Sequence, residues 1–355
     1  MKTKKSRKKK FRILVAILLL LLVATGSAIY MVARSYYNKS NYTPDEEAMD
    51  GYEAKEEIEE INPEDSQGEV LTPEEEEALN KEQEEILEAT PVEEDDDVYN
   101  VLLIGVDRRE KGWAGNSDSM ILMSLNHDKK QISMISLMRD TYVNIPGVGM
   151  RKLNAAHAKG AGPLLLKTVE ENFKIDVDRY VTVDFSSMST IIDKMGGIEL
   201  TMSNAEVNVA NNYIVEMCEL KNLDPEKYKI SKGGTRKYNG IQAVAYARIR
   251  YVGNSDYQRT ERQRTVLTKM LEKMKSMGLT DLMGFAEDVL PLVTHNIPEK
   301  EIWELLGKAP ALLEYQLVKD RIPYDGLYRI VYVKKQDMLV PDWEKTIEKL
   351  KDTLY

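Results

Sequence analysis

Apolar and polar positions are most regularly ordered after residue 98, where three short apolar runs follow one another. Residues 98–106, 120–125 and 131–137 are mostly apolar, and His127-Asp128-Lys129 forms a polar turn between the last two runs. Apolar runs of this length, bounded by polar turns, are typical of buried strands. We therefore predict three neighbouring strands that pair as hairpins.

A helical periodicity appears further along the chain. Apolar residues recur at helical spacing in four segments, which are residues 164–173, 185–195, 241–247 and 260–277. Pro163 suits a first helical position, and Gly196-Gly197 suits a helix stop. Two short strands are predicted at residues 180–183 and 198–201. This mixed order predicts an α/β fold with a three-layer α-β-α arrangement around a mixed, partly antiparallel central sheet.

Two regions do not follow this order. The polar stretch 203–237 interrupts the apolar segments, and we predict that it is an excursion from the core. Residues 278–355 are predicted to form a mixed C-terminal extension that packs on the domain or continues it. The main domain is accordingly expected to span residues 98–277.

The chain begins with a basic segment and a long apolar run. Residues 2–12 hold eight Lys and Arg, and residues 13–33 hold no charged side chain. About 20 apolar residues in a helix span the hydrocarbon core of a bilayer, and basic residues remain on the cytoplasmic side. We predict a cytoplasmic segment at 1–12 and a single transmembrane helix at 13–33. A cleaved signal peptide is the alternative, and both readings place the rest of the chain outside the cell.

An acidic segment follows the apolar run. Residues 38–97 contain 25 Asp and Glu but only three Lys, a formal charge of -22. Low hydrophobicity and like-charge repulsion favour an extended, disordered chain. We predict that residues 34–97 are an acidic linker between the membrane and the folded domain.

The overall formal charge of -10 therefore hides a mildly basic folded part, which suits an anionic substrate. Nucleic acid is not an expected partner, because only the short segment 1–12 faces the cytoplasm. Cys218 is the single cysteine and is expected to be a small buried residue. The three histidines have no metal-ligand spacing, and no serine-hydrolase elbow or P-loop occurs.

Two aspartates are candidates for a metal site. Asp107 follows the first predicted strand, and Asp118 opens the second. Carboxylates at the ends of paired strands can reach one hard cation such as Mg²⁺, although two unrelated surface acids remain the alternative.

Arginines are the second kind of candidate. Arg139 directly follows the third predicted strand, and its planar guanidinium matches phosphate oxygens; a structural pair with Asp140 is the alternative. A denser group lies between residues 248 and 264, and its members of interest are Arg248, Arg250, Arg259, Arg262 and Gln263. Residues two apart in an extended segment point the same way, so Arg248 and Arg250 are expected to act together. The start of the following helix also favours anions.

Taken together, these motifs resemble the LytR-CpsA-Psr family, whose members attach teichoic acids, capsules and similar polymers to peptidoglycan. The motifs occur in the family's order over about residues 98–277. They are residues 100–107, Ser117-Asp118, 139–143, 152–157, 183–185, 196–198, 239–243 and 247–250 with Arg262-Gln263.

The resemblance implies roles for the candidate residues. Asp107 and Asp118 would hold Mg²⁺ (or Mn²⁺) on a pyrophosphate, and Asp118 is also the first choice for a general base. Four arginines would clamp the phosphate oxygens, namely Arg139, Arg248, Arg250 and Arg259. Arg109, Arg262 and Gln263 match family positions near the same site. Two departures stand out: the family often has Arg where this chain has Asn116, and Pro where it has Met138.

The resemblance implies an envelope enzyme of the Gram-positive type. It would move a glycosyl phosphate from a polyprenyl pyrophosphate carrier to a sugar hydroxyl of peptidoglycan, outside the cell. A lipid-pyrophosphate hydrolase using the same site and a membrane-bound transcriptional attenuator are the alternatives. The general base, the particular polymer and the oligomeric state do not follow from the sequence.

Overall fold

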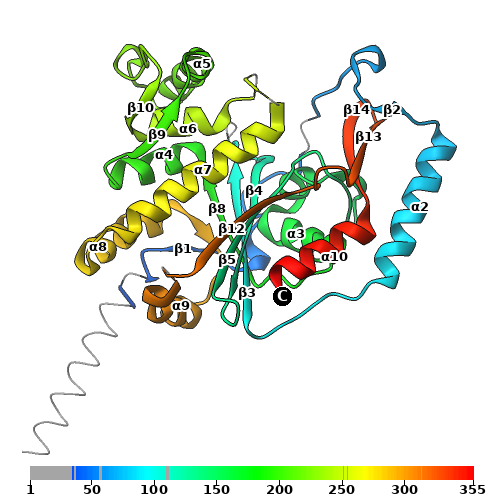
Figure 1. Ribbon diagram of the computed structural model, residues 1–355, viewed down its shortest axis with the longest axis horizontal. Helices are drawn as coiled ribbons and strands as arrows, with labels where there is room; N and C mark the ends of the chain where they lie inside the picture. Colours follow the sequence, from blue (N-terminus) through cyan, green and yellow to red (C-terminus); the bar gives the residue numbers. More distant parts are fainter. Residues whose placement is uncertain are drawn as a thin grey trace, which may run out of the picture.

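A seven-stranded mixed sheet forms the centre of the structure (Figure 1), with strand order β1-β11-β8-β3-β4-β5-β12. The structure is a computed structural model that describes residues 34–355, apart from residues 36, 56–57, 109–111, 251, 254 and 313. The sheet's strands are β1 (Asn41–Tyr42), β3 (Val98–Val106), β4 (Ser117–Asn126), β5 (Gln131–Leu137), β8 (Arg179–Asp184), β11 (Thr294–His295) and β12 (Gln316–Ile322). The predicted mixed α/β fold around a mixed sheet is therefore confirmed.

The three central strands form an antiparallel meander, as predicted. β3 pairs with β4, β4 pairs with β5, and Met120 of β4 lies opposite both Ile104 and Leu137. β8 and β12 join the outer sides of this meander in parallel. The register brings the end of β3, the start of β4 and the end of β5 to one edge of the sheet.

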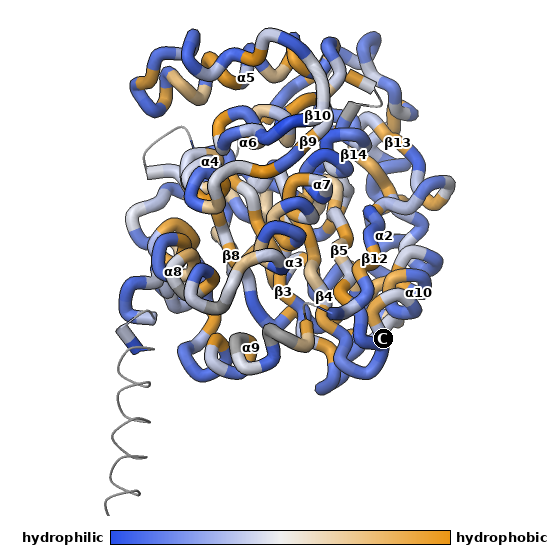
Figure 2. Tube along the Cα trace, turned by 60° about the vertical axis from the view of Figure 1, so that its left-hand side comes forward, coloured by the Kyte–Doolittle hydropathy of each residue, from blue (hydrophilic) through white to orange (hydrophobic). Residues whose placement is uncertain are grey.

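Helices cover both faces of the sheet. On one face, α3 (Ala155–Phe173) and α10 (Trp343–Leu354) pack on apolar side chains of the central strands. On the other face, α7 (Ser255–Lys275) contacts β5, where Arg264 Nη1 donates to Ser136 Oγ at 2.6 Å. Figure 2 shows apolar residues along β3, β4 and β5, and Figure 1 shows α7 on one side of the sheet and α3 and α10 on the other.

A second core lies beside the sheet and includes the stretch that we predicted to be a polar excursion. Residues 204–220 form α5 (Asn204–Leu220), which packs on α6 (Gly240–Arg248). It shares one apolar cluster with α4 (Phe185–Lys194) and the hairpin of β9 (Ile198–Met202) and β10 (Gly234–Tyr238). The prediction was wrong because the polar composition masks one apolar helix face, which includes Val207, Ile214 and Met217. Cys218 is buried there, as predicted.

The acidic linker is also ordered where the structure describes it. α2 (Pro73–Ala89) begins with a capping box of Thr72 and Glu75, and it buries Leu79 and Leu87. β1 pairs with β11, and β2 (Glu69–Val70) pairs with β13 (Tyr328–Val333). The prediction of a disordered linker was wrong for this part, because a few apolar side chains on one helix face suffice to dock an otherwise acidic helix.

The C-terminal region continues the domain. β12 completes the central sheet, and α10 covers one face. Two hairpins border the sheet edge, one formed by β6 (Tyr142–Ile145) and β7 (Gly149–Lys152), the other by β13 and β14 (Gln336–Pro341). The remaining helices are α8 (Leu279–Val289) and α9 (Glu299–Leu312).

The predicted cytoplasmic segment 1–12 and transmembrane helix 13–33 lie outside the described residues. Within the described part of the chain, no helix combines the length and the apolar character needed to cross a bilayer.

Candidate active site

A cavity of about 370 Å³ opens at the sheet edge where β3, β4 and β5 meet. Its lining is strongly polar and comes from segments far apart in the sequence. The lining residues are Ile58, Glu59, Asp107, Trp113, Asn116, Asp118, Arg139, Asp140, Lys152, Asn154, Ala155, Arg250 and Gln336. Four of the site residues predicted from the sequence line this cavity, namely Asp107, Asp118, Arg139 and Arg250. Arg259 is connected to two of them through Asp256, which pairs with Arg139, Arg250 and Arg259.

The strand register explains why the two predicted metal ligands meet. Asp107 follows β3 and Asp118 is the second residue of β4, so the antiparallel pairing brings both to the cavity. The loop between them crosses closely over the end of β3: Gly115 has φ +85°, and a Cβ there would lie 2.6 Å from the carbonyl oxygen of Asp107. His157 of α3 holds the same loop, with Nδ1 donating to the Gly115 oxygen at 2.8 Å.

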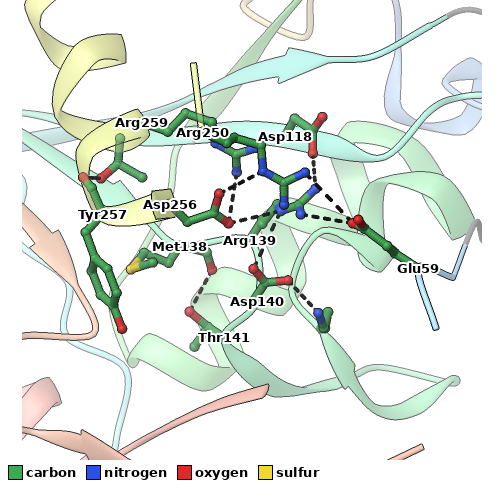
Figure 3. Close-up of polar contacts among 12 residues, drawn as sticks. Glu59, Asp118, Met138, Arg139, Asp140, Thr141, Arg250, Asp256, Tyr257 and Arg259 are labelled. Carbon is green, nitrogen blue, oxygen red and sulfur yellow. Dashed lines mark hydrogen bonds and ion pairs between the residues drawn. The ribbon is translucent and has the colours of Figure 1, made fainter. Parts of the chain in front are cut away.

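Arg139 is the centre of the polar network (Figure 3). Its Nη1 donates to Asp118 Oδ1 at 2.8 Å, and its Nε donates to Asp256 Oδ2 at 3.3 Å. Its Nη2 lies 3.4 Å from Glu59 Oε2, and its Nε lies 3.6 Å from Asp140 Oδ2. One guanidinium thus connects four carboxylates from four segments of the chain.

The backbone around Arg139 is fixed on both sides. Met138 N donates to Ile322 O of β12 at 2.8 Å, and Asn154 N donates to Arg139 O at 3.2 Å. Thr141 Oγ1 closes the turn by donating to Met138 O at 2.7 Å. A proline at position 138 could not donate the first of these bonds, so Met138 extends the pairing to β12 by one residue.

Asp256, near the start of α7, gathers three arginines. It accepts from Arg250 Nε at 3.0 Å and from Arg259 Nη2 at 3.4 Å, besides Arg139. Arg259 is almost completely buried, with 4% of its surface exposed. A mostly buried carboxylate shared by several guanidinium groups fixes their relative positions, because each lost contact would leave a poorly solvated charge.

These contacts lower the pKa values of two carboxylates in the site. Burial alone would raise the pKa of Asp118, but the guanidinium groups of Arg139 and Arg259 outweigh it and lower that pKa. The pKa of Asp256 is likewise lowered, because Arg259 and Arg139 outweigh the opposing effect of burial. Both carboxylates are therefore ionised at neutral pH.

The lining carries more acids than bases. Its charged members are Glu59, Asp107, Asp118 and Asp140 against Arg139, Lys152 and Arg250, a formal charge of -1. Lys152 Nζ donates to Asp140 Oδ1 at 2.6 Å, so one of the bases is also paired. A ligand with two phosphates therefore requires an additional cation, the displacement of a carboxylate, or both.

Arg248 does not join the cavity, contrary to the prediction that it acts with Arg250. Its Nη2 donates to Glu216 of α5 at 3.0 Å, and its guanidinium stacks on the rings of Phe185 and Tyr213. The reason is local: α6 ends at Arg248, so the two arginines are not in one extended segment and diverge.

The other predicted residues have different places. Arg262 is buried, and it donates to Ile249 O at 3.1 Å and Val252 O at 2.9 Å, so it holds the backbone on either side of Arg250. Gln263 is half-buried on α7 and is not among the cavity-lining residues of the described chain. Arg109 lies outside the described residues.

Sequence reasoning missed several members of the site. Asp256 stands among arginines, and an acid in such a stretch could have been read as their partner. Lys152 and Asn154 belong to a motif that was noted without an assigned role. Glu59 carried no signal, since it is one of 25 acids in its segment.

The sequence model of the LytR_cpsA_psr family matches residues 66–352. The chain belongs to this family. The match reaches beyond the predicted domain of residues 98–277 at both ends, so α2 and the C-terminal region are parts of the LytR_cpsA_psr match rather than additions to it.

Individual LytR_cpsA_psr relatives show the same likeness. The chain is 33% identical to Biofilm regulatory protein A of Streptococcus mutans over 263 residues, covering 68% of this chain and 62% of that protein. It is 34% identical to the polyisoprenyl-teichoic acid–peptidoglycan teichoic acid transferase TagT of Bacillus subtilis over 199 residues, covering 53% and 58%. The chain thus spans about six-tenths of the length of these two relatives.

A solved structure shares the fold. The family protein YwtF (TagT) with bound octaprenyl pyrophosphate lipid has a TM-score of 0.54 and 26% identity, over 74% of this chain and 93% of that chain.

Proposed function

We propose that this protein transfers an anionic glycopolymer from a polyprenyl pyrophosphate carrier to a hydroxyl group of peptidoglycan. The observation that carries the proposal is the convergence of Arg139, Arg250, Asp107 and Asp118 on one cavity. Membership of the LytR_cpsA_psr family supports it, because relatives include a teichoic acid transferase and a protein with bound octaprenyl pyrophosphate.

The reaction places specific demands on the site. The acceptor oxygen forms a bond to the phosphorus that carries the glycan, and its proton passes to water. The bridging P–O bond of the pyrophosphate breaks, and polyprenyl phosphate leaves with the bonding electrons. Negative charge grows on the phosphate oxygens as this bond breaks. Arg139 and Arg250 are fixed beforehand by Asp118 and Asp256, so they stabilise this charge without a large reorganisation. No external energy source is needed, because the carrier bond is already activated.

A divalent cation fits the acidic part of the cavity. Asp107 and Asp118 offer carboxylate oxygens, the ligands that Mg²⁺ and Mn²⁺ prefer. The described residues contain no cluster of three or more metal-binding side chains, and two protein ligands are consistent with a Mg²⁺ ion that keeps waters and substrate oxygens. When bound, the cation would neutralise phosphate charge and offset the acidic lining.

Asp118 is better suited to that cation than to proton transfer. Its lowered pKa makes it a weak base, and a base works best when its pKa lies near the working pH. We therefore assign Asp118 to the metal and to Arg139 rather than to the hydroxyl proton.

The site would work outside the cytoplasmic membrane of a Gram-positive-type envelope, with residues 13–33 as a single-pass anchor and the N-terminus inside. This part of the proposal rests on the apolar run and its basic flank.

The proposal is tested by incubating the full-length protein with a lipid-pyrophosphate glycan and peptidoglycan. Transfer predicts polyprenyl phosphate together with polymer bound covalently to peptidoglycan. Release of free polymer in the presence of peptidoglycan would identify a hydrolase that uses water as the acceptor.

A further inference from the structure

Two described parts of the acidic segment that precedes the family match lie beside the cavity. We call residues 52–55 and 58–61 the strap. On one side, Glu53 N donates to Gly112 O at 2.8 Å, and Trp113 Nε1 donates to Lys55 O at 2.9 Å. Trp113 itself lines the cavity, so this attachment lies at its rim.

The other end of the strap is attached to the β13–β14 hairpin. Ile61 N donates to Lys335 O at 2.9 Å, and Tyr332 Oη donates to Ile61 O at 2.8 Å. Gln336 Nε2, another lining residue, donates to Glu59 O at 3.5 Å. The backbone of residues 58–61 is thus held at a defined place beside the cavity.

This placement brings the carboxylate of Glu59 to the arginines. Glu59 Oε2 lies 3.4 Å from Arg139 Nη2 and 3.9 Å from Arg250 Nη1, and Figure 3 shows it facing both from a separate segment. The Glu59 side chain is 68% exposed, whereas the Arg139 side chain is 12% exposed. The carboxylate therefore lies on the solvent side of the arginines, at the entrance of the cavity.

We propose that the strap is an internal competitor, in which Glu59 occupies the position of one substrate phosphate and must move aside when the pyrophosphate binds. The proposal rests on the proposed function, because it takes Arg139 and Arg250 as the phosphate-binding groups. The acidic lining supports it: removal of Glu59 from the lining changes the formal charge from -1 to zero, which favours an anionic ligand.

The size of the effect follows from exposure. Ion pairs with an exposed partner contribute little, so the competition is mild and reversible. We expect Glu59→Gln to tighten pyrophosphate binding by about fivefold, since two exposed contacts are relieved. Gln keeps the shape of the side chain and removes only the charge.

Glu60 provides a matched control. It is the next residue of the strap, and its carboxylate pairs with exposed Lys335, with Oε2 3.1 Å from Nζ, rather than with the cavity arginines. Glu60→Gln removes the same charge from the same segment. It is expected to change pyrophosphate affinity by less than about twofold.

The test measures the binding of inorganic pyrophosphate to the full-length protein and both variants in detergent by titration calorimetry, with transferase kcat and KM measured in parallel. The expected result is tighter binding and a lower KM for Glu59→Gln than for the wild type and for Glu60→Gln. Equal affinity of wild type and Glu59→Gln would overturn the proposal, as would an equal gain in Glu60→Gln.

The proposed function can fail independently. Tighter pyrophosphate binding in Glu59→Gln, without any release of polyprenyl phosphate, would refute the proposed transfer reaction and support competition by Glu59. A lack of pyrophosphate binding in all three proteins would refute competition by Glu59.

Discussion

Replacing Asp256 with Asn removes the charge that three arginines share and leaves the shape of the side chain intact. Asp256 is 16% exposed in its side chain, and Arg259 is 5% exposed, so water compensates only in part. Removing one partner of a buried ion pair costs about 3–5 kcal/mol. Arg139 keeps Asp118 and Asp140 as partners, so we expect the lower end, about 3 kcal/mol.

Thermal unfolding of the full-length protein measures this change. About 2 °C per kcal/mol is typical of large domains, so the Tm should fall by about 6 °C. The control is Asp325→Asn, which removes the exposed partner of Arg321 and should lower the free energy of unfolding by less than about 1 kcal/mol. Equal Tm values for Asp256→Asn and wild type would refute the view that Asp256 organises the arginines.

The same variant has a predicted pH dependence. The pKa of Asp256 is lowered in the folded state, so its ionised form stabilises the fold above the unfolded pKa, near 3.9. This contribution is lost as the pH falls through the folded pKa. In strong acid the free energy of unfolding of the wild type should therefore approach that of Asp256→Asn. A difference between the two that does not change with pH would contradict the charge-based explanation.

Three further predictions follow from particular contacts. Arg248→Ala should lower kcat far less than Arg250→Ala does, because Arg248 pairs with Glu216 outside the cavity; equal losses in a transfer assay would show that Arg248 reaches the substrate. Asp107→Asn, and treatment of the wild type with EDTA, should each reduce transfer, and an undiminished rate after complete metal removal would exclude the cation from the mechanism. His157 is neutral and buried, and burial lowers its pKa to about 4. Between pH 6.5 and 4 only the unfolded chain binds this proton. Urea unfolding should therefore show that the free energy of unfolding falls with falling pH by about 3 kcal/mol more in the wild type than in His157→Gln.

The central part of the fold could be predicted because it depends on local patterns. The apolar runs at residues 98–106 and 131–137 match β3 and β5 in full, and antiparallel pairing of neighbouring strands then places Asp107, Asp118 and Arg139 at one edge. The convergence of these three residues follows from the register, so the sequence was sufficient.

The positions of the other arginines could not be predicted in the same way. Arg248 and Arg250 were expected to point together, but the helix that ends at Arg248 separates them. A shift of a helix end by one or two residues turns a side chain to another face, and such ends are the least predictable part of an element. The positions of Asp256 and Arg259 depend on where α7 begins, and it begins at Ser255 rather than near residue 260.

The ordered acidic segment was missed for a different reason. Average composition describes whether a segment can fold alone, but α2 and the strap are stabilised by contacts with distant parts of the chain. Leu79 and Leu87 are too few to predict docking, and Glu59 meets Arg139 across 80 residues.

Polyprenyl phosphate release by Arg250→Ala tests the central claim most directly. The control is Arg329→Ala, since Arg329 is exposed and pairs with Glu69 away from the cavity lining. Loss of a fixed positive group that stabilises charge in the transition state costs about 100- to 1,000-fold in kcat. We predict such a loss for Arg250→Ala and a wild-type rate for Arg329→Ala. Wild-type turnover by Arg250→Ala would show that the reaction takes place elsewhere.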